Sequence, residues 1–172
     1  MSAPTSAMVR TAIFVSDLER SRAFYETILG WTEVYIDVEL TEGNTWQLLG
    51  QPPGAGCHAL ILKAPGDPMG MVGLFQLKED APPKAQRPEG RRAHIGEGCM
   101  VFYCQDLDPV VAALQAGGHE ILSPPVAFKV GDYEKQREMI FRDPDGMMIN
   151  LIEWDLSRDD KPELDQGARI EG

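Results

Sequence analysis

The fold is decided by residues 9–31, which read VRTAIFVSDLERSRAFYETILGW. Apolar side chains alternate over residues 9–15, a pattern that predicts a β-strand. Ser16 and Glu19 have the spacing of a capping box, so we expect Ser16 to be the N-cap of a helix. Gly30 is a natural end for that helix, because glycine accepts the left-handed conformation. The stretch therefore predicts a strand, a turn and an amphipathic helix in direct succession.

This unit is expected to occur twice in the chain. Three further strands follow the helix, at residues 32–38, 58–63 and 71–77. Asp17-Leu18 then recurs as Asp106-Leu107, 89 residues later. The second copy has a strand at 99–104, a helix that opens at Asp106 and ends at Gly117-Gly118, and strands at 120–123, 136–141 and 147–154. The sequence thus predicts a duplicated βαβββ module.

We expect a single domain over residues 8–156. Module one covers residues 8–78, a connector rich in proline and charge covers 79–98, and module two covers 99–156. The end segments 1–7 and 157–172 are polar and are expected to be flexible tails.

The composition excludes some classes of partner. The formal net charge of -11 repels phosphate backbones and anionic lipid headgroups, so neither nucleic acid nor membrane partners are expected. The three cysteines lack CxxC spacing, which argues against a disulfide framework and favours a reducing cytoplasm.

Two motifs at the ends of the repeat carry a resemblance to a known family. The first is Val15-x-Asp17-Leu18-x-x-Ser21-x-x-Phe24-Tyr25-x-x-x-Leu29-Gly30-Trp31, and the second is Arg142-Asp143-Pro144-Asp145-Gly146. With the duplication, they resemble the vicinal oxygen chelate (VOC) superfamily of glyoxalases, bleomycin-resistance proteins and extradiol dioxygenases. The resemblance implies an α+β fold in which two βαβββ modules form a curved mixed sheet around a cavity, and it implies a homodimer. It does not choose an activity, because this fold carries both enzymes and binding proteins.

Members of the superfamily that use a metal hold it at four strand positions, typically with His, Gln or Glu. The resemblance places these positions at Arg10, Gln76, Cys99 and Asn150. Arginine has no lone pair to offer, a lone cysteine does not make a site, and the two amides are weak neutral ligands. We therefore expect no metal and no other cofactor. The alternative is a divalent metal held by displaced ligands: His94, Gln76 and Glu153.

Strand alternation gives the expected lining of the cavity. The predicted ligand-binding residues are Arg10, Phe14, Leu74, Gln76, Cys99, Val101, Tyr103, Met148 and Asn150. Arg10 has two interpretations: a structural ion pair at a strand end, or a fixed cation that holds the carboxylate or enolate of a ligand. Cys99 is either a small buried residue or a nucleophile, and Cys99 and Tyr103 are the candidate catalytic residues.

The expected function is that of a glyoxalase- or bleomycin-resistance-like protein that binds a small organic molecule in an apolar cavity without a catalytic metal. The molecule is an anion if Arg10 faces it. Whether the protein sequesters this molecule or transforms it stays open. The alternatives are a metal-dependent lyase or dioxygenase of the same superfamily with displaced ligands, and a non-enzymatic assembly protein that uses its acidic C-terminal tail.

Overall fold

A computed structural model of the chain describes residues 5–66, 68–78, 83–85, 93–130 and 133–154, with the side chains of 128–136 outside the description. The chain divides into two compact units. The first unit comprises residues 1–98 and 142–147, and the second comprises residues 99–141 and 148–172. The predicted tail at 157–172 lies outside the described residues, and the predicted connector is described only in part.

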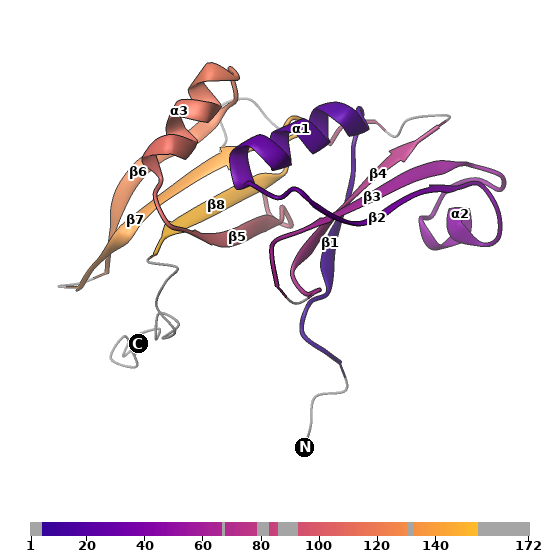
Figure 1. Ribbon diagram of the computed structural model, residues 1–172, viewed down its shortest axis with the longest axis horizontal. Helices are drawn as coiled ribbons and strands as arrows, with labels where there is room; N and C mark the ends of the chain where they lie inside the picture. Colours follow the sequence, from indigo (N-terminus) through magenta and orange to yellow (C-terminus); the bar gives the residue numbers. More distant parts are fainter. Residues whose placement is uncertain (1–4, 67, 79–82, 86–92, 131–132, 155–172) are drawn as a thin grey trace. The chain divides into compact units, whose positions relative to one another are not determined.

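The first unit is a mixed four-stranded sheet with two helices (Figure 1). Its elements are β1 (Arg10–Phe14), α1 (Leu18–Leu29), β2 (Glu33–Leu40), α2 (Thr45–Leu48), β3 (Cys57–Lys63) and β4 (Met71–Leu77). The strand order is β1-β4-β3-β2, in which β1 is parallel to β4 and the other neighbours are antiparallel.

The two helices of this unit lie on opposite sides of the sheet (Figure 1). α1 covers the face that carries the buried side chains of Ile13, Leu60 and Leu74. On the other face, which we call the open face of the first sheet, the α2 segment covers only the part formed by β3 and β4. There Leu40 and Leu49 pack against a small cluster made of Cys57, Ala59, Phe75 and Leu77. The open face stays uncovered along β1, at Arg10 and Phe14, and the side chains of β2 before Leu40 are exposed as well.

The second unit repeats this arrangement. Its elements are β5 (Cys99–Cys104), α3 (Asp108–Ala116), β6 (Ile121–Val130), β7 (Tyr133–Arg142) and β8 (Met148–Glu153). The strand order is β5-β8-β7-β6, with β5 parallel to β8 and β6 antiparallel to β7. The predicted α+β fold of two βαβββ repeats with mixed sheets is confirmed.

The strand registers show the duplication residue by residue. Phe14 pairs with Phe75 in the first unit, and Tyr103, which lies 89 residues after Phe14, pairs with Ile152 in the second. Each residue of β4 consequently has its counterpart 77 residues later in β8. This correspondence identifies equivalent positions in the two repeats without reference to any other protein.

The start of α1 differs from its prediction. Asp17, not Ser16, is the N-cap, and its carboxylate accepts a hydrogen bond from the backbone N–H of Arg20. Ser16 instead donates its backbone N–H and its hydroxyl to the carboxylate of Asp145, at 3.0 and 2.5 Å. The predicted capping box is wrong because the helix begins one residue later, with Asp17 as its cap, and Ser16 binds Asp145, 129 residues away in the chain. The end of the helix is as predicted, since Gly30 has a left-handed φ of 70°.

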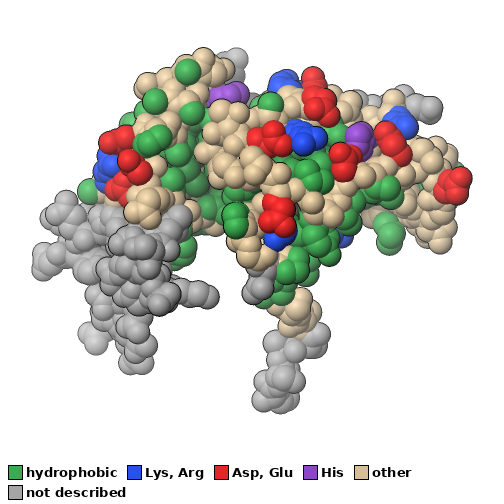
Figure 2. Space-filling model, in the orientation of Figure 1, with side chains coloured by type: hydrophobic (Ala, Val, Ile, Leu, Met, Phe, Trp, Pro, Cys, Tyr) green, Lys and Arg blue, Asp and Glu red, His purple; other side chains and the backbone are tan. Residues whose placement is uncertain are grey.

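Other boundaries differ where local signals are weak. β4 and β5 have the predicted bounds, whereas α2 has no counterpart among the predicted elements and β6 and β7 are longer than predicted. Of the described helices, none has the length and apolar character that a membrane span requires. On the face shown in Figure 2, acidic and basic side chains are interspersed and hydrophobic side chains reach the surface between them.

Candidate functional site

Arg10 and Phe14 lie on the open face of the first sheet, as strand alternation predicts. Their neighbours Ile13 and Val15 are buried, whereas Phe14 is 40% exposed. The ring of Phe14 meets the ring of Phe75 edge to face, with 6.5 Å between the centroids. Arg10 is exposed and forms no ion pair with any described residue. The structural ion pair considered for Arg10 is therefore not found within the described part of the chain.

Leu74 and Gln76 lie on the other face of that sheet, which corrects their predicted place in the lining. Leu74 pairs with Ile13 in the β1–β4 ladder and is fully buried. The side-chain oxygen of Gln76 accepts a hydrogen bond of 2.7 Å from the backbone N–H of Leu18, at the start of α1. The error is one of strand parity, because a shift of one residue moves every side chain to the opposite face.

Gly73 takes the place that Gln76 had in the prediction. Ala12 pairs with Gly73, and Val101, 89 residues after Ala12, pairs with Asn150, so Gly73 is the counterpart of Asn150. A Cβ atom at Gly73 would lie 2.9 Å from Cε2 of Phe75 and 3.6 Å from Cδ of Arg10. The position has no side chain, and the aromatic ring and the arginine stem fill the space that one would need.

The predicted residues of the second unit share the face of its sheet that lies opposite the buried Met100. Val101 is 56% exposed and Tyr103 is 48% exposed, and Cys99 is an exposed free cysteine. Cys99 pairs with Met148 and Val101 with Asn150, which places all five on one open face. The Asn150 amide is buried and donates to the carbonyl oxygen of Met139 at 3.1 Å and to Glu138 at 3.4 Å. The catalytic roles considered for Cys99 and Tyr103 stay predictions.

Of the displaced metal ligands considered above, Gln76 and Glu153 have bound side-chain oxygens, whereas the buried Nε2 of His94 has no hydrogen-bond partner among the described residues. The Gln76 oxygen is bound by the start of α1. Glu153 accepts hydrogen bonds from Arg137 at 2.6 and 2.9 Å, which lowers its pKa, and from the backbone N–H of Leu107 at 3.3 Å. His94 is 3.3 Å from Glu97 through Nδ1. Within the described residues, no three His, Cys, Asp or Glu side chains gather as a metal site would require.

The positions that the resemblance assigns to metal ligands hold different side chains from those of metal-using members. In the first unit they hold Arg10 and Gly73, and in the second unit they hold Cys99 and Asn150. Arginine is a cation, glycine has no side chain and asparagine is a neutral amide, so only the thiol of Cys99 is a good ligand for a divalent metal.

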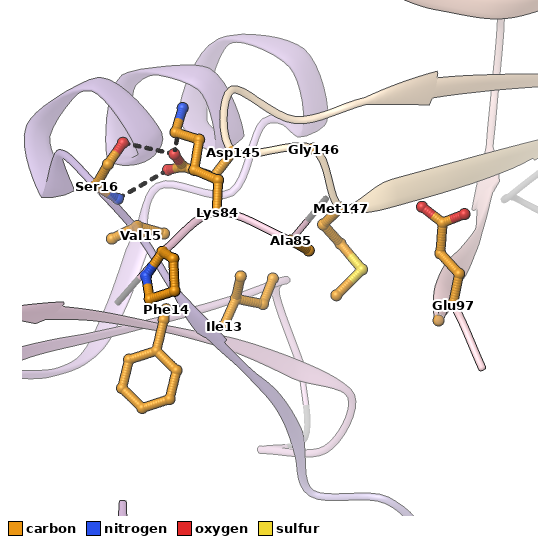
Figure 3. Close-up of a pocket in the computed structure, with 12 residues that line it drawn as sticks. Ile13, Phe14, Val15, Ser16, Lys84, Ala85, Glu97, Asp145, Gly146 and Met147 are labelled. Carbon is orange, nitrogen blue, oxygen red and sulfur yellow. Dashed lines mark hydrogen bonds and ion pairs between the residues drawn. The ribbon is translucent and has the colours of Figure 1, made fainter. Parts of the chain in front are cut away.

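Sequence reasoning missed a cavity of about 390 Å³ in the first unit (Figure 3). Its apolar wall includes Ile13, Phe14, Val15 and Met147, and its charged lining residues are Lys84, Glu97 and Asp145. Asp145 accepts from Ser16 and lies 3.0 Å from the guanidinium of Arg20. By sequence alone, the motif Arg142-Asp143-Pro144-Asp145-Gly146 serves only as a family signature. Its charged residues were the sequence feature that could have indicated a polar site at this turn.

A second carboxylate of the cavity wall is fixed by a buried arginine. Nη1 of Arg142 donates to Glu97 and to the carbonyl oxygen of Gly146, and the bond from Arg142 is the main reason that the pKa of Glu97 falls to about 2. The backbone N–H of His94 donates to the same carboxylate at 3.1 Å. Glu97 is therefore an ionised acid whose charge is already balanced.

The turn that carries these partners is itself anchored by a buried hydrogen bond. The Tyr25 hydroxyl donates to the Asp143 carboxylate at 2.9 Å. Burial raises the pKa of both groups, and the backbone N–H groups of Asp145 and Met147 also donate to Asp143. The Arg142–Gly146 turn is thus bound to α1 at two points, through Asp143 to Tyr25 and through Asp145 to Arg20.

Comparisons with known proteins agree with this architecture. A glyoxalase family protein from Bacillus cereus superposes with a TM-score of 0.69 at 20% identity, over 89% of this chain and 98% of that one. An antibiotic binding protein from Streptomyces sp. (TnmS3) gives 0.54 at 22% identity, over 88% and 98%. Lactoylglutathione lyase from Agrobacterium tumefaciens gives 0.50 at 24% identity, over 90% and 98%. At these identities the structures show a shared fold.

A comparison with curated proteins gives no significant match. The sequence model of the Glyoxalase/Bleomycin resistance protein/Dioxygenase superfamily matches residues 7–151, which is most of the chain. The two motifs that open and close the repeat both fall within that match. The chain therefore belongs to the glyoxalase/bleomycin resistance protein/dioxygenase superfamily.

Proposed function

We propose that this protein binds a small organic anion on the open face of its first sheet and does so without a catalytic metal. The observation that carries the proposal is the side-chain set Arg10, Gly73, Cys99 and Asn150 at the positions where metal-using relatives hold their ion. A guanidinium at the first position supplies the positive charge that a metal would otherwise supply.

Arg10 has the surroundings expected of an anion clamp. Its stem and the ring of Phe75 both lie against Gly73, its side chain is exposed, and Phe14 packs on Phe75 further along the same face. Arginine binds carboxylates and sulfonates through paired N–H donors, and aromatic neighbours add apolar contact area. A flat aromatic anion satisfies both features.

Two of the similar structures correspond to the two functions under consideration, ligand binding and catalysis. The Streptomyces neighbour is an antibiotic binding protein, whereas the Agrobacterium neighbour is a lactoylglutathione lyase. The lyase shows that the same fold also carries an enzyme, which is the alternative function. The side chains of the present chain favour the binding role, since they offer a fixed cation in place of a set of metal ligands.

The metal question is tested on protein purified without chelator and without nickel resin. We expect plasma mass spectrometry to find far less than one equivalent of Zn, Ni, Mn, Fe or Co per chain. One equivalent of a divalent metal per chain would overturn the proposal and would support a metal-dependent lyase or dioxygenase.

The anion clamp is tested with the fluorescent aromatic sulfonate 8-anilino-1-naphthalenesulfonate as probe. Arg10→Met should weaken its binding about tenfold, the effect of one lost charge-assisted hydrogen bond. The matched control is Lys78→Met, which removes the same charge from the exposed Lys78–Glu39 ion pair on the same sheet. Equal affinity in Arg10→Met and in the wild type would show that the guanidinium does not hold the anion.

We also propose that the protein is a cytoplasmic homodimer. Support for the dimer comes from the exposed apolar side chains Val34, Tyr35, Ile36 and Val38 along β2, which a second copy of the chain would cover. The cytoplasmic location rests on Cys57, Cys99 and Cys104, which form no disulfide. Light scattering on the eluting protein should give twice the mass of one chain. A mass of one chain at micromolar concentration would contradict the dimer.

A further inference from the structure

The cavity beside the Arg142–Gly146 turn has the size and lining of a small-molecule site. Its volume of about 390 Å³ falls in the range of ligand pockets, and all of its lining residues belong to the first unit. Figure 3 shows Ile13, Phe14 and Val15 on one side of it and Met147 on another, with Glu97 at the far end. These walls offer apolar contact to a ligand on several sides.

Neither carboxylate of the lining needs a cation from a ligand. Asp145 accepts hydrogen bonds from both donors of Ser16 and forms an ion pair with Arg20. Glu97 is bound by the buried Arg142 and by His94. Each acid thus has a positively charged partner behind it, and these partners cancel the repulsion that an entering anion would otherwise meet.

Lys84 is the cation among the described lining residues, and its ammonium group has donors to spare. It lies 3.4 Å from Asp145, which is longer than a normal hydrogen bond, and its side chain is 64% exposed. An ammonium group has three N–H donors, and among the described residues Asp145 is the partner of this one. The ammonium group lies beside the Asp145 carboxylate, on the α1 side of the cavity (Figure 3), and the long lysine side chain can turn towards a bound anion.

We propose that this cavity is a second binding site, for a small molecule with an apolar body and one carboxylate or sulfonate group that is held by Lys84. The site differs from the proposed anion clamp in its cation, because Arg10 does not line it. The apolar wall at Phe14 and Met147 takes the body of the molecule, and the ammonium group takes its charged end. The proposal does not depend on the function proposed above.

Octanoate is a suitable probe, because it joins a carboxylate to an unbranched apolar chain. Titration of the ¹⁵N-labelled full chain should shift the backbone amides of Ser16, Gly98 and Gly146 with a single saturable dissociation constant. Lys84→Met should weaken that constant about tenfold, whereas Lys84→Arg should keep it within about threefold of the wild type. Lys78→Met is the matched control and should bind octanoate as the wild type does.

Two results would overturn the proposal. One is unchanged octanoate binding in Lys84→Met, and the other is a set of shifts confined to amides outside the cavity. Arg10→Met separates this site from the anion clamp: octanoate affinity should stay at the wild-type value, even where affinity for the aromatic sulfonate falls. Loss of octanoate binding in Arg10→Met with full binding in Lys84→Met would assign the probe to the open face instead.

Discussion

At the residue scale, Gly73 and Phe75 determine what the open face of the first sheet can hold. Gly73 stands where the repeat has Asn150, and the Phe75 ring lies so close that a Cβ at Gly73 would meet it at 2.9 Å. A metal-binding side chain at this position would therefore require the ring to move first. Gly73 offers no metal-binding side chain, and the ring of Phe75 fills the space that such a side chain would need.

Gly73→Ala is expected to destabilise the protein by about 1–3 kcal/mol, because the buried ring of Phe75 has to leave its position. Urea unfolding measures the change. Phe75→Leu shortens the side chain that collides, so the double variant should lose less than the sum of the two single variants. Strict additivity of the two losses would show that the methyl group and the ring do not meet.

Glu97 should make stability depend on pH in the acid range. Its pKa falls from an ordinary 4.5 to about 2, mainly through the hydrogen bond from Arg142. A carboxyl group with a lowered pKa in the folded state stabilises the protein above its unfolded pKa, and this contribution is lost as the pH falls from about 4.5 towards 2. The wild type should therefore exceed Glu97→Gln in stability at pH 6, and the gap should close on acidification.

The measurement is the urea midpoint of both proteins between pH 6 and pH 2.5, as far as each remains folded. Glu26→Gln is the control, since it removes a carboxylate from the exposed Arg22–Glu26 pair on α1. A gap between the wild type and Glu97→Gln that stays constant over the whole range would contradict the assignment.

At the element scale, α1 and α3 share one attachment near their starts, a hydrogen bond from a backbone N–H to a side chain of the neighbouring strand. Gln76 of β4 accepts the backbone N–H of Leu18 at the start of α1, and its counterpart Glu153 of β8 accepts that of Leu107 at the start of α3. Free N–H groups at a helix start need an acceptor, and a side chain on the neighbouring strand supplies it. Gln76 and Glu153, two of the three residues considered as displaced metal ligands, therefore attach a helix to its sheet.

Gln76→Leu should cost about 1–2 kcal/mol, because it leaves the half-buried N–H of Leu18 without its acceptor. Gln76→Glu keeps an acceptor and places a negative charge at a helix N-terminus, where it is favourable, so its stability should stay within about 0.5 kcal/mol of the wild type. Thermal or urea unfolding separates the two variants. An equal loss in both would refute the role of the acceptor.

How far the sequence predicts the fold also depends on the element. β1, α1, β4 and β5 lie close to their predicted bounds, because alternation, a glycine stop and the repeat are all local signals. β6 extends beyond Ser123 through Pro124 and Pro125, a pair that reads locally as a break. Antiparallel pairing with β7 continues the strand, and that partner cannot be inferred from either segment alone.

The candidate site was predictable only in part for the same reason. Alternation along β1 and β5 placed Arg10, Phe14, Val101 and Tyr103 on the open faces. Gln76 and Leu74 were assigned to the wrong face because β4 is buried on both faces, so its apolar sequence has no alternation that identifies the open face. The cavity at Lys84 was not predicted, because its walls come from segments that are distant in the chain.

At the scale of the whole molecule, the Arg142–Met147 segment lies in the second repeat by sequence and in the first unit by structure. Its members bind residues of the first repeat: Asp145 binds Ser16 and Arg20, and Asp143 binds Tyr25. The stability of α1 therefore depends on a turn more than 110 residues away in sequence.

Asp145→Ala should raise amide hydrogen exchange in α1, because Ser16, Arg20 and Lys84 all lose a charged partner. The global cost should be about 2–3 kcal/mol, as for the loss of hydrogen bonds to a charged acceptor. Asp108→Ala, which removes an exposed partner of Arg137 in the second unit, is the control and should leave α1 unchanged. Unchanged protection of α1 in Asp145→Ala would show that the turn does not support the helix.

The placement of that turn limits how the gene can be rearranged. If the second half were exchanged for the matching half of a related protein, Ser16, Tyr25 and Glu97 would meet a turn with other side chains. A hybrid would need the six residues from Arg142 to Met147 to accompany the N-terminal half. The two repeats correspond residue by residue, but they are not interchangeable, because one turn of the second repeat binds side chains of the first.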